Sequence, residues 1–157
     1  MFGSKGDDQG QFNNPYGIVV DEKNQHIIVS DEGNHRLQSF SRQGQYLSSY
    51  GSKGSGNGQF NYPRQLCIHP LSNHIIVADW YNHRLQMLTD QFQFVKVIGQ
   101  GQLQYPRAVD CSRSTHHIVT ADCNRQLHLY SSDGNTLIRS YTARNFLLLS
   151  ASRTTTH

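Results

Sequence analysis

Ser30–Phe40 reads SDEGNHRLQSF and Ala78–Leu88 reads ADWYNHRLQML, so the motif Asp-x-x-Asn-His-Arg-Leu-Gln occurs twice, 48 residues apart. Such a repeat indicates either a chemical site that is used twice or a structural unit that has been copied. The two interpretations differ in how far the similarity extends. A copied unit also repeats the segments on both sides of the motif.

Prolines and aspartates recur in register along the chain, which favours the copied unit. Three pairs share a spacing of 16 residues: Pro15 with Asp31, Pro63 with Asp79, and Pro106 with Asp122. An apolar residue stands three positions before each proline, and a Gly-rich lead precedes it. The units begin 48 and then 43 residues apart, because the third lead is five residues shorter. The chain therefore contains three repeats whose leads vary in length.

Each repeat carries strand signals only. In the first, β-branched runs at 17–21 and 26–31 flank a polar turn, and two further runs follow. The second run is apolar at consecutive positions in every repeat: 27–29, 75–77 and 118–119. This pattern predicts a strand that is covered on both faces. Four short antiparallel strands in each repeat indicate an all-β fold, an incomplete β-propeller of three four-stranded blades.

The pattern G-x-F-x-x-P-x-G followed by D-x-x-N-H-R-L-Q resembles the NHL repeat. The resemblance covers residues 2–141 and predicts blades at 2–51, 50–99 and 98–141. Residues 142–157 are expected to form an irregular tail or part of a fourth blade. Three blades are too few to close a propeller, which needs about four to eight. We therefore expect further blades, or self-association, to complete the ring.

The third repeat departs from the pattern, because it reads ADCNRQLHLY where the second reads ADWYNHRLQML. If one residue is deleted, Arg125 takes the place of the histidine and Gln126 takes the place of the arginine. The divergence makes this the least regular of the three predicted blades.

The Gly-rich lead FGSKG is most similar to the C-terminal NHL regions of tripartite-motif proteins. That resemblance implies a non-catalytic module that holds protein or RNA partners. It also implies substrate or RNA recognition for a ubiquitin ligase whose catalytic machinery lies in domains outside this chain. An RNA-specific reader in post-transcriptional repression is the alternative. The repeat type does not identify the partner, because one fold hosts many functions.

The repeated motif itself is expected to be structural. Its aspartate ends the second strand and its His-Arg pair begins the third, so it spans a tight hairpin loop. Asp and Asn favour such loops because they bond nearby backbone N–H groups, and Arg adds a charge-assisted bond to Asp. We expect these side chains mainly to clamp the loop: Asp31, Asn34, Arg36, Asp79, Asn82, Arg84 and Asp122.

A ligand face is expected on the rim where this hairpin loop opens, because the segment that leads into the first strand reaches the same rim. Its residues combine cations with aromatic rings: Tyr16, Arg64, Arg107, Trp80, Tyr81, His35, His83, Lys5 and Lys53. Cations neutralise phosphates and flat side chains stack on bases, so this composition favours single-stranded or hairpin RNA. Exposed Trp, Tyr and Arg equally suit a protein partner.

Position within the blade separates these residues further. Tyr16, Arg64 and Arg107 follow the prolines and begin the first strand, so they are expected at the mouth of the central channel. The formal net charge of the 157 residues is only +3. Acidic residues on the same loops, such as Glu32, reduce the local positive charge as well. Charge alone therefore does not identify a polyanion-binding protein.

An enzyme is the minor alternative. Some NHL-type propellers, the amidating lyases, use histidines from several blades around a zinc ion, and His26, His74 and His117 recur at equivalent positions here. Those histidines begin the second strand, away from the hairpin rim, and their spacing does not force nitrogen atoms to converge on a metal. The motifs G-x-S-x-G, H-E-x-x-H and the P-loop are absent from the sequence. We expect no catalysis, no metal and no cofactor.

Composition narrows the cellular context. The sequence contains no apolar run of about 18 residues and no apolar signal region at its start, so we expect no membrane partner and a cytoplasmic or nuclear location, with the cytoplasm favoured. Three cysteines without C-x-x-C spacing argue against a disulfide framework and a zinc knuckle. Two of them lie in apolar runs, where a free cysteine is usually a small buried hydrophobe.

Overall fold

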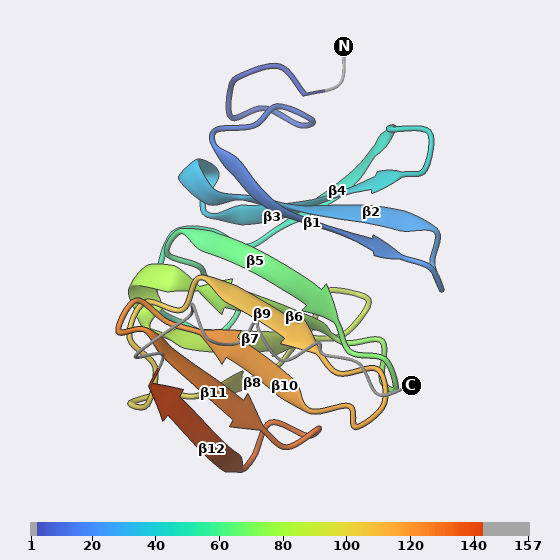
Figure 1. The fold of residues 1–157 in the computed structure, drawn as a ribbon. Helices are drawn as coiled ribbons and strands as arrows, with labels where there is room; N and C mark the ends of the chain where they lie inside the picture. The colour runs from blue at the N-terminus through green and yellow to red at the C-terminus, as the bar shows by residue number, and fades with distance from the viewer. Residues whose placement is uncertain (1–2, 143–157) are drawn as a thin grey trace, which may run out of the picture.

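The computed structural model describes residues 3–142, which form three antiparallel sheets of four strands each (Figure 1). Blade 1 comprises β1 (Pro15–Asp21), β2 (His26–Asp31), β3 (Arg36–Ser41) and β4 (Tyr46–Tyr50). Blade 2 comprises β5 (Pro63–Ile68), β6 (Ile75–Asp79), β7 (Arg84–Leu88) and β8 (Phe94–Ile98). Blade 3 comprises β9 (Ala108–Cys111), β10 (Ile118–Ala121), β11 (Gln126–Tyr130) and β12 (Leu137–Thr142).

Strands follow chain order within every sheet, and each pairs antiparallel with its neighbour. The prediction of an all-β fold built from four-stranded propeller blades is confirmed. The described residues contain no α-helix, and none of them belongs to a helix that is long and apolar enough to cross a membrane.

The hairpins between the second and third strands contain one turn of 3-10 helix in blades 1 and 2. These turns are η1 (Glu32–Asn34) and η2 (Trp80–Asn82). A histidine in the left-handed conformation follows each turn, His35 with φ 53° and His83 with φ 54°. Arg125 has φ 60° directly before β11, which agrees with its predicted alignment to these histidines. Left-handed backbone costs a non-glycine residue roughly 1–2 kcal/mol, so the turn must be stabilised by other contacts.

Apolar side chains fill the spaces between the sheets. The core between blades 1 and 2 contains Ile28, Leu37, Phe60, Leu66, Ile75, Val77 and Leu88. The core between blades 2 and 3 contains Cys67, Ile76, Ala78, Leu85, Met87, Ile98, Leu103, Val109, Cys111, Ile118 and Tyr130. Strand β6 is buried along its whole length, because both faces of blade 2 are covered. In the outer blades Ile27 and Val119 remain only partly buried.

The outer face of blade 1 is covered only in part within the described residues, since Phe12, Val29 and Phe40 form a buried cluster but Ile18 does not join it. Ile18 is 62% exposed, whereas Leu66 at the equivalent register position of β5 is 0% exposed. Leu66 packs against Gly17 of blade 1, where an added Cβ would lie 2.7 Å from the Arg64 carbonyl oxygen. Glycine therefore permits the close approach of β1 and β5. The tail or partial blade expected at 142–157 lies outside the described residues beyond Thr142, the end of β12.

Candidate binding face at the hairpin rim

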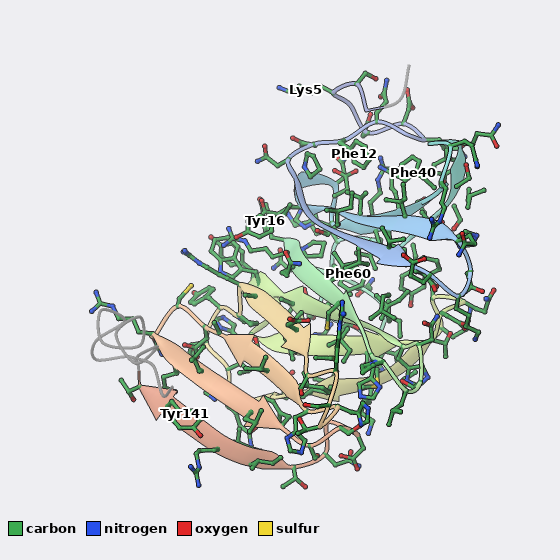
Figure 2. The ribbon with its side chains drawn as sticks, turned by 45° about the vertical axis from the view of Figure 1, so that its right-hand side comes forward. Lys5, Phe12, Tyr16, Phe40, Phe60 and Tyr141 are labelled. Carbon is green, nitrogen blue, oxygen red and sulfur yellow. The ribbon has the colours of Figure 1, made fainter. Side chains whose placement is uncertain are left out.

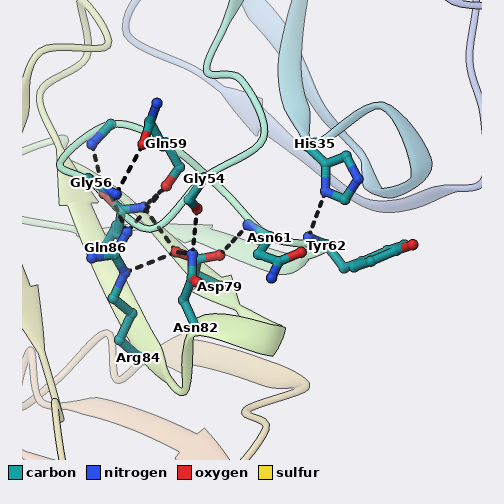
Figure 3. Close-up of polar contacts among 11 residues, drawn as sticks. His35, Gly54, Gly56, Gln59, Asn61, Tyr62, Asp79, Asn82, Arg84 and Gln86 are labelled. Atoms are coloured by element: carbon teal, nitrogen blue, oxygen red, sulfur yellow. Dashed lines mark hydrogen bonds and ion pairs between the residues drawn. The ribbon is translucent and has the colours of Figure 1, made fainter.

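The motif aspartate of blade 2 organises its own hairpin and lead (Figure 3). The Asp79 carboxylate accepts hydrogen bonds from the Asn61 backbone N–H at 2.7 Å and from the Asn82 amide at 2.8 Å. It also accepts from Arg84 Nε at 2.9 Å and from Gln86 Nε2 at 3.0 Å. Asp79 is completely buried, and a buried carboxylate is tolerated only when donors surround it in this way.

Arg84 and Gln86 extend the clamp to the Gly-rich lead. Arg84 donates to the carbonyl oxygens of Gly56 and Gln59, at 2.8 and 3.2 Å. The Gln86 amide accepts from the Gly58 backbone N–H at 3.0 Å. The bridge between Lys53 and Phe60 pairs the lead with itself, so these bonds help to hold it against the blade. The second half of the motif therefore fixes the lead rather than facing solvent.

Blade 1 repeats this arrangement around Asp31. Its carboxylate accepts from the Asn13 backbone N–H at 2.7 Å, Asn34 at 2.8 Å, Arg36 at 2.9 Å and Gln38 at 3.1 Å. The structure thus places the aspartate, asparagine and arginine of both complete motifs in loop clamps.

Blade 3 uses different donors around Asp122. Its carboxylate contacts His128 Nε2 at 3.1 Å and accepts backbone N–H bonds from Gln104, Asn124 and Gln126. His128 stands where the other repeats have glutamine, and the described contacts of Asp122 include no arginine. The divergent repeat therefore keeps the aspartate and replaces most of its partners.

The motif histidines connect successive blades. His35 Nδ1 accepts a hydrogen bond from the backbone N–H of Tyr62 at 3.1 Å, and His83 Nδ1 accepts one from Tyr105 at 3.2 Å. Each imidazole also lies edge-on to the ring of the same tyrosine, at 4.5 and 4.1 Å. Burial lowers the pKa of His35 below its usual 6.5, and Lys53 lowers it further. Both histidines were expected on the ligand face, and the structure places them at the inter-blade contacts.

Arg64 is engaged at the first inter-blade interface, between blades 1 and 2. Its Nε donates to Glu32 Oε1 at 2.6 Å, and the two side chains are only 13% and 11% exposed. Its guanidinium lies 3.3 Å from the ring centre of Trp80 and 5.0 Å from that of Tyr16. These contacts use both the charge and the flat face of Arg64. The pairing with Glu32 could not be anticipated, because the two residues lie 32 positions apart.

Arg107 occupies the equivalent place at the second inter-blade interface, between blades 2 and 3, and it is exposed. Trp80 stands where blade 1 has Glu32, so Arg107 has an aromatic ring at 6.0 Å instead of a carboxylate. The backbone carbonyl of Arg107 accepts a bond from the Gln65 N–H at 3.4 Å, which joins β5 to the start of blade 3. Arg107 therefore presents its charge to solvent, and Arg64 does not.

Four aromatic rings gather beside Arg107. Trp80 and Tyr81 lie 4.4 Å apart between ring centres, and Tyr105 lies 5.9 and 5.6 Å from them. Tyr62 contacts Tyr81 at 5.2 Å. Tyr81 is 44% exposed, whereas Trp80 is partly covered by Arg64. We call Tyr62, Trp80, Tyr81 and Tyr105 the aromatic cluster. Tyr62 and Tyr105 were not among the expected site residues, although each directly precedes the proline of its repeat.

The remaining expected cations lie in the Gly-rich leads. Lys5 and Lys53 are both exposed. Figure 2 shows Lys5 on the N-terminal lead, well apart from Tyr16. Tyr16 is 48% exposed beside Arg64. The structure therefore brings together Tyr16, Arg64, Trp80, Tyr81 and Arg107 along one rim, but it leaves Lys5 away from them.

The recurring histidines stand at the start of the second strands: His26 begins β2, His74 directly precedes β6 and His117 directly precedes β10. Within residues 3–142, no group of three or more His, Cys, Asp or Glu side chains is arranged to hold a metal ion. His74 instead lines a cavity of about 630 Å³ between blades 2 and 3, together with His69 and Lys96. Burial lowers the pKa of His74 below its usual 6.5.

Comparison with known proteins identifies the repeat. The family model for the NHL repeat matches residues 12–40 and 60–87. The chain is 33% identical over 137 residues to Protein brain tumor of Drosophila melanogaster, covering 87% of this chain and 13% of that protein. It is 38% identical over 138 residues to the B-box type zinc finger protein ncl-1 of Caenorhabditis elegans, covering 87% of this chain and 16% of that protein.

A solved structure of a streptogramin B lyase is similar in fold. The TM-score is 0.69 at 14% identity, over 92% of this chain and 44% of the lyase chain. Sequence identity at this level shows a shared fold and nothing about shared activity. The chain spans less than a fifth of the curated relatives and less than half of this structural neighbour.

Proposed function

Since the chain is built of NHL repeats, most like those of tripartite-motif proteins, we propose that it is a non-catalytic binding module whose hairpin rim engages single-stranded or hairpin RNA. The observation that carries this proposal is an exposed arginine and an exposed tyrosine on either side of one ring: Arg107 lies 6.0 Å from the ring centre of Trp80, and Tyr81 lies 4.4 Å from it. An arginine can neutralise a phosphate while a neighbouring tyrosine stacks on a base. The ring of Tyr81 packs against the other three rings of the aromatic cluster.

A protein partner is the second candidate, and a specific observation favours it. Glu32 neutralises Arg64, so the rim carries less free positive charge than the sequence suggests. A packed aromatic centre with one arginine has the composition of a protein-binding hot spot. In either case the module supplies recognition, and a ubiquitin-ligase activity would belong to domains outside this chain.

Titration with a panel of labelled single-stranded and hairpin RNAs tests the first candidate. We expect one RNA to be preferred at 50 and at 200 mM salt. Arg107→Ala should lower the salt slope of log K by about one unit through loss of one phosphate contact, and Tyr81→Ala should weaken binding by roughly 1–3 kcal/mol with little change in slope.

Arg42→Ala is the matched control for charge, because Arg42 pairs with Glu22 in turns that join the strands at the other rim. If Arg42→Ala and Arg107→Ala lower RNA affinity equally, binding depends on the net charge of the protein and not on a site at the hairpin rim. Binding that is weak, indifferent to sequence and abolished by 200 mM salt would favour the protein scaffold.

A further inference from the structure

Two cysteines meet at the second inter-blade interface, far from the hairpin rim. Cys67 lies in β5 and Cys111 ends β9, and their sulfur atoms are 3.4 Å apart. They come from different blades, 44 positions apart in the sequence. Cys67 is 6% and Cys111 8% exposed. The sequence predicts that buried cysteines are small hydrophobes, and residues 44 positions apart carry no local signal that they touch.

The described side-chain contacts between blades 2 and 3 are non-covalent, and the contact between the two thiols is one of them. Ile76, Val109 and Ile118 pack around the two thiols in the shared core. A disulfide at this point would join the first strands of two separate sheets. The sulfur atoms would have to approach by about 1.4 Å, since a disulfide bond is about 2.05 Å long. Side-chain rotation is the smallest movement that can supply such a shift.

A cavity lies beside the pair. This cavity of about 420 Å³ is lined by both cysteines, together with Val19 of blade 1 and with Asp110 and Arg113 of blade 3. The cavity therefore lies where the first strands of all three blades come together. The cavity borders two cysteines that are themselves almost completely buried.

We propose that Cys67 and Cys111 form a reversible modification site, at which a small disulfide oxidises the two thiols to an inter-blade disulfide. One cysteine thiolate attacks the reagent disulfide, forming a mixed disulfide and releasing one reagent thiolate. The second cysteine thiolate then attacks the protein sulfur of that mixed disulfide and releases the other reagent thiolate. The two cysteine protons end on the two released thiols, so two protein thiols are oxidised and one reagent disulfide is reduced.

The surroundings make this exchange slow at neutral pH. The hydrogen bond with Cys111 raises the pKa of Cys67 well above its usual value, and burial raises it further. Because the thiolate is the attacking species, the rate should increase steeply with pH. The third cysteine, Cys123, is exposed at the hairpin rim and donates to the Tyr105 carbonyl oxygen at 3.2 Å. It will react with the same reagent, so it must be removed in the test.

The test treats the whole folded chain carrying Cys123→Ser with oxidised glutathione at pH 7.5 and 8.5. We expect an intact mass lower by about 2 Da, a linked peptide pair containing Cys67 and Cys111 after proteolysis, and faster reaction at pH 8.5. The midpoint of thermal unfolding should rise by roughly 5–10 °C and return after reduction with dithiothreitol.

Cys111→Ser on the Cys123→Ser background should lose both the linked peptide and the thermal shift. Cys67→Val serves the same purpose if a serine at 111 impairs folding. The proposal is overturned if the linked peptide forms only in urea, or if the product is a disulfide between two chains. It is also overturned if glutathione remains attached to either cysteine and the disulfide between Cys67 and Cys111 does not form.

Discussion

The two inter-blade interfaces use equivalent positions in the repeat and reach different results. At the first, Glu32 of blade 1 meets Arg64 of blade 2 in a 2.6 Å ion pair. At the second, Trp80 of blade 2 stands 6.0 Å from the guanidinium of Arg107 of blade 3. The first interface is therefore neutral and closed, whereas the second leaves a cation and an aromatic cluster at the surface. The difference follows from one hairpin position, which is an acid in blade 1 and an aromatic residue in blade 2, and the proposed binding site lies at the second interface.

Removing the clamp under the second interface should have the largest effect. Asp79→Ala leaves the Arg84 charge buried and three other donors without the carboxylate that accepts from them. We therefore expect the free energy of unfolding, measured by urea titration, to fall by about 3–5 kcal/mol. Asp31→Ala should cost less, because the Arg36 side chain is 14% exposed and that of Arg84 only 6%. A larger loss from Asp31→Ala would mean that the two clamps do not differ as their burial suggests.

The two arginines should separate stability from binding. Arg64→Ala leaves the Glu32 carboxylate without its partner, so we expect a loss of about 1–2 kcal/mol of stability. Arg107→Ala should change stability by less than about 0.5 kcal/mol, since its side chain is exposed. RNA affinity should follow the opposite order. Urea denaturation and RNA titration of the same two variants measure the two losses. If one variant loses more in both assays, the two interfaces do not differ in the way proposed.

Removing the charge of Glu32 should make the first inter-blade interface more like the second. Glu32→Gln keeps the size of the side chain and removes its charge, so Arg64 becomes available to a phosphate. We expect the salt slope of RNA binding to steepen by about 0.7–0.9, with a modest gain in affinity at low salt. Glu22→Gln, on the other rim, is the matched control and should leave the slope unchanged.

The smallest expected effect is a pH dependence at the first interface. The Tyr62 N–H needs an unprotonated His35 Nδ1, and burial lowers the pKa of His35. The folded state therefore binds the proton less readily than the unfolded state. This contribution to stability is fully present above about pH 6.5 and is lost as the pH falls through the lowered pKa.

Urea titrations between pH 7.5 and 5 measure that dependence. His35→Asn should flatten it, because asparagine tolerates the left-handed backbone, accepts a hydrogen bond and does not titrate. His26→Asn, at the start of β2, is the control. An equal change of slope in both variants would assign the pH dependence to general charge rather than to this contact.

Much of the fold follows from local rules that act over a few residues. The β-branched runs, the polar turns and the constant interval from proline to aspartate are sufficient to predict twelve strands in three blades. The clamp around Asp79 is predictable for the same reason, since Asn82 and Arg84 lie within five positions of it. Hydrogen bonds over such short intervals depend on loop geometry that the residue types themselves favour.

Contacts between blades depended on the tertiary structure. Glu32 meets Arg64, His35 meets the Tyr62 backbone, and Cys67 meets Cys111 across intervals of 27 to 44 residues. The sequence by itself determined the repeat, the strands and the rim on which the variable residues gather. Only the packing of one sheet on the next decided which cation is neutralised, which histidine joins two blades and which thiols touch, because those partners are set by the stacking of whole blades and not by neighbours along the chain.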